Sequence, residues 1–313
     1  MNSLTLKQMR YFEALARYGH FGHAAEACAI SQPALSMQIR EMEQNLGAAL
    51  FERGARGVRL TGFGEAAAGH VRAVLREVEA LGDLARAARE GLVGPLRLGV
   101  IPTIAPYLLP RLVGRLQRDH AGLDIQVRET LTGRLIDELN YGRLDTAIVA
   151  LPVSEPTLHE EPLFSENFVL VRPLAEAGFA VPDRAALRAM RLLLLEEGHC
   201  FRDQALSFCD FGAARPRELL DGSSLSTLVQ MVGAGIGVTL IPEMAVPVET
   251  RSAAVSVVRL REPQPGRRIG MVWRKASPLG RQLGQLAEVV RAVGESAEGG
   301  GRWGGEDGPS KAR

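Results

Sequence analysis

The chain has 313 residues, enough for about two domains, and 46% of them are hydrophobic while 23% are charged. This composition excludes collagen, a coiled-coil fibre and a wholly disordered protein. The net charge is +1, so bulk charge neither favours nor excludes nucleic acid as a partner. No aliphatic run approaches the roughly 20 residues of a membrane span. Charges interrupt the apolar pattern at the N-terminus, unlike a signal peptide. We therefore expect a cytoplasmic protein that does not associate with membranes.

Residues 1–65 are predicted to form a small helical domain. Three helices fit residues 5–18, 22–29 and 31–46. Thr5 can cap the first helix and Ser31 the third, where Pro33 follows in the first turn. The side chains expected to face the core are apolar and recur at helical spacing: Leu6, Met9, Phe12, Leu15 and Ala16 in the first helix, and Leu35, Ile39, Met42 and Leu46 in the third.

The exposed face of the third helix is predicted to be polar near its start, where it carries Gln32, Pro33, Ser36, Met37 and Arg40. The following segment, FERGARGVRLT, spaces three arginines evenly: Arg53, Arg56 and Arg59. A polar helix start presented by two smaller helices is typical of a helix-turn-helix that reads base edges, and an arginine-rich β-wing would contact phosphates. Helix spacing alone leaves open the alternative of a solvated bundle with a basic loop.

A dense set of residues over some forty positions resembles the winged helix-turn-helix of LysR-type transcriptional regulators. It comprises Ala24-Ala25, Cys28, Ser31-Gln32-Pro33-Ala34, Ser36, Gln38-Ile39, Met42-Glu43, Leu46-Gly47, Leu50-Phe51, Arg53, Thr61 and Gly64. Gly22 departs from the family pattern, in which many members have a polar residue. The resemblance implies a double-stranded DNA operator and RNA polymerase as partners, and an inert helix-packing role for Cys28.

Residues 66–93 are predicted to form a linker, with one long helical pattern over residues 66–91 that Gly94-Pro95 breaks. Apolar residues recur along it at alternating steps of three and four: Val71, Val74, Val78, Leu81, Ala85 and Ala88. Such a seam predicts pairing with a second helix, hence a dimer. The alternative is a helix that lies on its own domain. The family resemblance implies homodimers that associate into homotetramers.

From residue 94 onward, short apolar runs alternate with helical stretches, which predicts βαβ units and a mainly parallel sheet. The expected strands are Leu96–Ile101, Ile125–Val127, Thr146–Val149, Phe168–Val171, Leu192–Leu195, Gly237–Ile241, Val255–Leu260 and Ile269–Trp273. The resemblance implies that residues 94–293 form an α/β regulatory domain of periplasmic-binding-protein type. Its two subdomains would be connected near residues 165 and 265, with a ligand cleft between them. The glycine-rich tail, residues 294–313, is predicted to be disordered.

Two of the three cysteines, Cys200 and Cys209, lie close together in LLLLEEGHCFRDQALSFCD, residues 192–210. A strand, a glycine turn and a helix start are expected before Cys200. The helix dipole, a protonated His199 and nearby Arg202 would lower the pKa of its thiol and favour a reactive thiolate. Cys209 has phenylalanines on both sides and is predicted to be buried. The alternative is a pair of core cysteines that act as small hydrophobic residues.

The spacing in GHCFRDQALSFC resembles the redox segment of peroxide-sensing activators within the LysR family. The resemblance implies that Cys200 is the peroxidatic cysteine, that Cys209 resolves it, and that hydrogen peroxide is the ligand. It further implies that peroxide and its water are held by Thr103, Thr132, His199, Asp203 and Gln204, and that Arg268 binds the rearranged oxidised segment. Taken alone, a threonine after a strand, such as Thr103, is more commonly a helix N-cap.

No metal site and no cofactor motif is predicted, and we expect a regulator rather than an enzyme. Two other functions stay open from the sequence. One is a LysR-type regulator whose cleft binds a small organic effector, with incidental cysteines. The other is a thiol peroxidase, which would leave the winged helix without a purpose.

Overall fold

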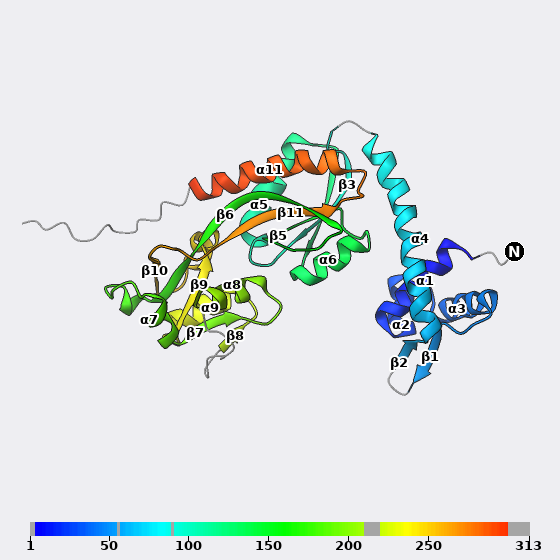
Figure 1. The fold of residues 1–313 in the computed structure, drawn as a ribbon, viewed down its shortest axis with the longest axis horizontal. Coiled ribbons are helices and arrows are strands. Elements are labelled where there is room, and N and C mark those ends of the chain that lie inside the picture. The colour runs from blue at the N-terminus through cyan, green and yellow to red at the C-terminus, as the bar shows by residue number, and fades with distance from the viewer. Residues whose placement is uncertain (1–3, 55–56, 89–90, 210–219, 300–313) are drawn as a thin grey trace, which may run out of the picture. The chain divides into compact units, whose positions relative to one another are not determined.

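The computed structural model describes residues 4–54, 57–88, 91–209 and 220–299. It divides into two compact units, Met1–Ala85 and Arg86–Arg313, which are described separately below (Figure 1).

The first unit packs three helices against a two-stranded wing and the start of a long helix. Its elements are α1 (Leu6–Tyr18), α2 (Phe21–Ala27), α3 (Gln32–Leu46), β1 (Phe51–Gly54), β2 (Gly57–Leu60) and α4 (Gly62–Ala87). The predicted caps are confirmed, because the Thr5 and Ser31 side chains accept hydrogen bonds from the backbone N–H groups of Gln8 and Ala34. Leu6 is 42% exposed, so its predicted burial is wrong. Gln8 is buried instead, because it completes a capping box with Thr5.

The long helix α4 begins and ends about four residues earlier than the sequence pattern predicts. Thr61 caps its start by accepting a hydrogen bond from the Gly64 N–H at 2.9 Å. A Cβ at Gly64 would lie 2.1 Å from the Leu50 carbonyl oxygen, so only glycine permits this close approach. Val71 and Leu75 lie in the core of the first unit. Part of the predicted seam therefore packs within its own domain, while Val74, Leu81 and Leu84 stay exposed.

The second unit is built on a nine-stranded sheet with the order β4-β3-β5-β11-β6-β9-β7-β8, in which β10 also pairs with β6. The strands are β3 (Gly94–Val100), β4 (Leu123–Glu129), β5 (Thr146–Leu151), β6 (Leu158–Pro173), β7 (Leu192–Leu195), β8 (Leu220–Gly222), β9 (Val238–Pro242), β10 (Val255–Arg259) and β11 (Gly266–Arg274). The pairs at the two ends are parallel, but β6, β10 and β11 pair antiparallel with their neighbours. The expectation of a mainly parallel sheet is wrong at its centre, because two long strands there run between the halves.

Two hydrophobic cores divide this unit into the expected subdomains. β6 pairs with β11 up to Asn167 and with β9 from Phe168 onward. Figure 1 shows β6 and β11 running side by side through the middle of the unit. The chain thus crosses at about Asn167 and returns at Gly266, close to the predicted residues 165 and 265.

Helices cover both halves of the sheet. The first core includes residues of α5 (Ala105–Asp119), α6 (Thr132–Asn140) and α11 (Gly280–Gly299). The second core includes residues of α7 (Arg184–Ala189), α8 (Cys200–Cys209), α9 (Leu225–Gly233) and α10 (Val246–Glu249). Two short 3₁₀ turns, Leu174–Glu176 and Glu243–Ala245, complete the elements of this unit among the described residues.

The predicted disorder of residues 294–313 is wrong for its first part, because α11 continues to Gly299. Gly294 is buried, and a Cβ at this position would lie 2.2 Å from the ring of Phe164. Glycine here permits close packing of helix on strand rather than flexibility. Residues 300–313 lie outside the described part of the chain.

A buried acid fixes the first residues of the second unit. Asp145 is fully buried and forms ion pairs with Arg86 at 2.8 Å and Arg97 at 2.7 Å. Gln282 donates a hydrogen bond to the Ala87 carbonyl at 3.1 Å. Burial alone would raise the pKa of Asp145, but the hydrogen bonds from Arg97 and Arg86 outweigh it and hold that pKa below its ordinary value.

Candidate functional site

Cys200 lies at the boundary between the two halves of the second unit. The chain turns at Gly198, which has a φ of +97°, and Cys200 is the first residue of α8. Its free thiol is half-buried and packs against the first core. Phe201 and Ala205, in the same helix, belong to the second core. The first turns of α8 therefore contact both cores of the second unit.

Two polar atoms in α8 and at the start of α6 are buried and have no hydrogen-bond partner among the described residues: Gln204 Oε1 and Thr132 Oγ1. A Cβ at Gly198 would lie 3.0 Å from Leu131 Cδ1, so the turn before Cys200 contacts the start of α6, where Thr132 is the first residue. Gln204 follows Cys200 by four residues in α8, which places both on one helix face. Leaving a buried polar atom unpaired costs about 1–3 kcal/mol. Such atoms are suited to a small polar ligand or to water.

Thr103 is buried, 3% exposed, beside a buried ion pair. Its interpretation as a helix N-cap is wrong, because the N-cap of α5 is Ile104 and has no side-chain cap bond. The Thr103 hydroxyl instead accepts a hydrogen bond from Arg267 Nη1 at 2.7 Å. Arg267 Nη2 also pairs with Glu166 at 2.6 Å, with both side chains almost completely buried. In this bond Thr103 Oγ1 acts as the acceptor, so its own hydroxyl proton is still available for donation.

Arg267 is not among the site residues predicted from the sequence, whereas its neighbour Arg268 is. The Arg267 guanidinium lies 5.7 Å from the centre of the Phe201 ring, directly after Cys200 in the chain. Arg268 is exposed on the other face of β11, and its role in the oxidised state stays a prediction. Strand alternation could have found Arg267, because it shares a face with the buried Ile269 and Met271.

The electrostatic surroundings of Cys200 differ from the expectation in two respects. Burial lowers the pKa of His199, against the opposing effect of Glu196, so its imidazole is neutral at pH 7 and supplies hydrogen-bonding nitrogens rather than positive charge. Arg202 is buried and donates to the Leu195 carbonyl and to Asp221, both at 2.6 Å. Its guanidinium is therefore bound to β7 and β8. Of the three expected features, the helix start at Cys200 is the one observed.

Asp203 is exposed, whereas Phe201 and Ala205 of the same helix are buried. The structure therefore does not bring Asp203 into the buried group around Cys200, and its role in holding peroxide stays a prediction. An acidic residue in the first turn of α8 is favourable for the helix dipole, which is reason enough for its presence.

Cys200 and Cys209 are the two ends of α8. Nine residues at a helical rise of 1.5 Å separate their Cα atoms by about 13 Å. A disulfide requires a Cα separation below about 7 Å. The side chain of Cys209 lies outside the described residues, so its predicted burial is not tested. Cys28 ends α2 and packs against the core of the first unit, where burial raises its pKa. A raised pKa makes that thiol unreactive.

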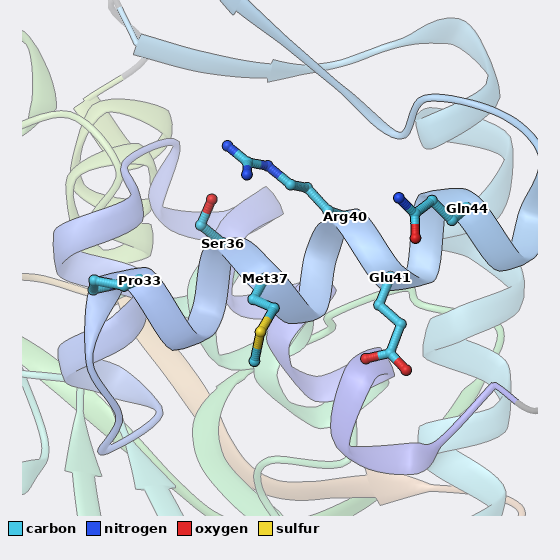
Figure 2. A pocket seen from close by; sticks show the side chains of 6 residues that line it. All are labelled: Pro33, Ser36, Met37, Arg40, Glu41 and Gln44. Carbon is cyan, nitrogen blue, oxygen red and sulfur yellow. The ribbon is translucent and has the colours of Figure 1, made fainter.

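The exposed face of α3 is the candidate DNA-binding face in the first unit. Figure 2 shows Ser36, Arg40 and Gln44 on one side of the helix, at steps of four residues. A hollow of about 550 Å³ runs along this face and is lined by Pro33, Ser36, Met37, Arg40, Glu41 and Gln44. Gln32 is exposed just before it. The prediction did not include Gln44, although extending the spacing of Ser36 and Arg40 by one turn identifies it.

The predicted wing exists as the antiparallel pair β1–β2. Arg59 in β2 is exposed, and Arg53 lies in β1 opposite Val58. The side chain of Arg53 and the whole of Arg56 lie outside the described residues. Glu43 of α3 fixes the start of the wing by accepting hydrogen bonds from the backbone N–H groups of Leu50 and Phe51.

Two further functions to consider for the described residues are metal binding and membrane spanning. Among them, no three side chains of His, Cys, Asp or Glu are grouped so that they could hold a metal ion. The described helices also include none with the length and apolar character needed to traverse a bilayer.

Comparison with known proteins gives consistent matches over both units. Residues 6–65 match the family described as bacterial regulatory helix-turn-helix protein, lysR family, and residues 89–295 match the LysR substrate binding domain. The chain is 45% identical to a probable hydrogen peroxide-inducible genes activator from Streptomyces viridosporus, over 92% of this chain and 93% of the relative.

Solved structures that align over most of the chain are similar as well. A cysteine-to-aspartate variant of OxyR from Pseudomonas aeruginosa is 37% identical with a TM-score of 0.71, over 92% of this chain and 95% of that one. A hydrogen peroxide-bound cysteine-to-serine mutant of OxyR from Corynebacterium glutamicum is 34% identical with a TM-score of 0.65, over 94% and 93% of the two chains. The chain therefore belongs to the LysR family and, within it, to the OxyR group.

Proposed function

We propose that this chain is a cytoplasmic, DNA-binding transcriptional regulator that responds to hydrogen peroxide, and that it is not an enzyme. Residues 1–65 would bind a double-stranded operator and residues 66–93 would dimerise. Residues 94–293 would sense peroxide, with Cys200 as the peroxidatic and Cys209 as the resolving cysteine. RNA polymerase would be the partner through which bound protein activates transcription.

One observation carries the proposal: a free thiol at a helix start shares α8 with the buried, unpartnered Gln204 Oε1, and the turn before it contacts the start of α6, where Thr132 Oγ1 is also buried and unpartnered. Hydrogen peroxide is small and both donates and accepts hydrogen bonds, so it matches an amide oxygen and a hydroxyl. The buried side chains of Thr103, Glu166 and Arg267 occupy neighbouring space between the two halves. That occupancy favours a two-oxygen ligand over a larger organic effector.

The chemistry proceeds in two balanced steps. The Cys200 thiolate attacks one oxygen of hydrogen peroxide, the O–O bond breaks, and sulfenic acid and hydroxide form. The hydroxide takes a proton and leaves as water, with the hydroxyls of Thr103 and Thr132 and the neutral His199 imidazole available to orient it and to pass the proton. The Cys209 thiolate then attacks the sulfenic sulfur and the S–O bond breaks. The disulfide forms, and the departing hydroxide takes up the proton that the Cys209 thiol released, which gives the second water.

The second step couples chemistry to conformation. The helical distance of about 13 Å between the Cα atoms prevents a disulfide on the reduced backbone. α8 must therefore unwind, which alters its packing against the second core. A redox-biased element of this kind can reset contacts between subunits and so the spacing of two DNA-binding heads. The proposed mechanism requires a dimer. Its contact surface would be the exposed apolar residues of α4: Val74, Leu81 and Leu84.

Thiol titration and DNA footprinting of the full-length protein test the proposal. The chain has three cysteines, so one equivalent of hydrogen peroxide should consume two thiols and leave Cys28 free. The Cys200→Ser variant should lose no thiol to peroxide. In the Cys209→Ser variant, oxidation of Cys200 should stop at a sulfenic acid that a dimedone probe captures. Reaction should end after one peroxide per chain when no reductant is present. A footprint that responds to a metabolite but not to peroxide would contradict the proposal, and so would retention of all three thiols.

A further inference from the structure

The C-terminal end of α8 is held by a neighbouring short helix. α7 (Arg184–Ala189) contacts α8 and is fixed in place at two points. Leu187 is fully buried in the second core. Asp183 caps the helix by accepting a hydrogen bond from the Ala186 N–H at 2.8 Å. The first residue of α7 is therefore presented from a rigid support.

That first residue, Arg184, lies over an aromatic ring of α8. Its guanidinium carbon is 4.5 Å from the centre of the Phe208 ring, within the range of a cation–π interaction. Phe208 is half-buried and packs against the second core on its other side. It directly precedes Cys209, so its backbone cannot stay in place when Cys209 moves about 6 Å or more to reach Cys200.

We infer that Arg184 is a positioning residue of the redox switch, which holds Phe208 and thereby stabilises the reduced form of α8. This inference rests on the proposed function. The contact exists in the helical state and must break before the disulfide forms. Removing it therefore raises the equilibrium constant for disulfide formation and speeds the condensation of the sulfenic acid with Cys209. It leaves the attack of Cys200 on peroxide unchanged, because Arg184 is at the opposite end of α8.

The size of the effect follows from the exposure of Arg184. A cation–π contact at an exposed site corresponds to about a two- to five-fold change in an equilibrium constant. Arg184→Gln should therefore raise the disulfide equilibrium constant by about two- to five-fold, and Arg184→Lys should stay near the wild type because it keeps a cation. Arg191→Gln removes the same charge from an exposed position just after α7 and is the matched control.

Full-length variants are equilibrated with graded ratios of reduced and oxidised dithiothreitol, and the disulfide fraction is read by alkylation and mass spectrometry. Phe208→Leu should reproduce the effect, and adding Arg184→Gln to it should change nothing further. Dimedone capture in a Cys209→Ser background should proceed at one rate with and without Arg184→Gln.

Three outcomes would overturn the inference. The first is an equilibrium constant for Arg184→Gln equal to that of Arg191→Gln. The second is an effect of Arg184→Gln that persists in full after Phe208→Leu, since the ring would not transmit it. The third is a changed rate of sulfenic acid formation. Failure of the wild type to form any disulfide would instead refute the proposed function itself.

Discussion

Replacing Arg267 by methionine should strongly destabilise the reduced regulatory unit. The guanidinium pairs with Glu166 at 2.6 Å and also binds the Thr103 hydroxyl and carbonyl at 2.7 and 3.0 Å. The exposed fractions of the Arg267 and Glu166 side chains are 0% and 1%. Removing one partner of a buried pair leaves an uncompensated charge and costs about 3–5 kcal/mol. For a unit of this size each kcal/mol lowers Tm by about 2–4 °C, so the expected loss is about 6–20 °C.

The pH dependence of this loss has a defined sign. Burial raises the pKa of Glu166, while the Arg267 guanidinium opposes the rise. Without that cation the carboxyl pKa rises further above its unfolded value. A group with a raised pKa contributes stability below the unfolded pKa and loses it as pH increases through the folded pKa. Arg267→Met should therefore be less destabilised at pH 5 than at pH 8, where the isolated carboxylate must be charged.

The assay is urea unfolding of the reduced full-length protein, followed by tryptophan fluorescence and far-UV circular dichroism. Arg268→Met is the matched control, since its exposed side chain lies on the opposite face of β11 and the change should stay within about 0.5 kcal/mol. The double variant Glu166→Gln/Arg267→Met should recover much of the loss because no charge stays buried. Equal stability of Arg267→Met and Arg268→Met would refute the argument, as would a double variant whose losses simply add.

Gln32→Ala should weaken binding to the specific operator by about 1–3 kcal/mol and binding to random duplex DNA only slightly. Arg59→Ala should weaken binding to every DNA sequence alike and reduce the salt dependence of binding. If Gln32→Ala weakened binding to both duplexes equally, that would contradict a base-reading role. Leu81→Glu should shift sedimentation of the full-length protein toward monomer because Leu81 is 70% exposed on the apolar stripe of α4, and the control Glu77→Gln should not. Asp145→Asn should reduce the fall in the free energy of unfolding below about pH 4. The lowered pKa of the Asp145 carboxyl contributes stability that is lost as pH falls through that pKa. An unchanged pH dependence in urea unfolding would argue against that contribution.

The elements that local chemistry determines could be predicted from the sequence. Ser31, Pro33 and Gly47 delimit α3 as expected, because each satisfies or tolerates the unpaired backbone groups of a helix end. The crossing between subdomains also lies close to its expected position. The apolar seam of α4 is harder to interpret from the sequence. Its spacing at Val71 is compatible with contact to a second helix in a dimer and equally with packing inside the first unit. Only the packing of the first unit shows that Val71 belongs to the core.

Long-range pairing accounts for most of what the sequence could not predict at the site. A single arginine looks the same whether it lies in water or beside a carboxylate 101 residues away, as Arg267 lies beside Glu166. The same holds for Arg202, whose partners at Leu195 and Asp221 lie on two strands rather than at the thiol. Residue type and local spacing select the two cysteines, whose roles stay predictions, but the fold decides which cation each buried group contacts.

In the proposed mechanism, the burial along α8 lets one short helix hold both a fixed sensing thiol, Cys200, and a mobile partner, Cys209. Phe201 and Ala205, in its first half, are fully buried. In the second half Leu206 and Phe208 are half-buried and Ser207 is exposed. Regions with few buried apolar contacts open at lower free energy than the core. Unwinding from the end nearest Cys209 therefore costs less than unwinding from the end at Cys200. Cys200 would therefore keep its packed surroundings until the sulfenic acid has formed. Disulfide formation with Cys209 would then unwind the less buried half of the helix.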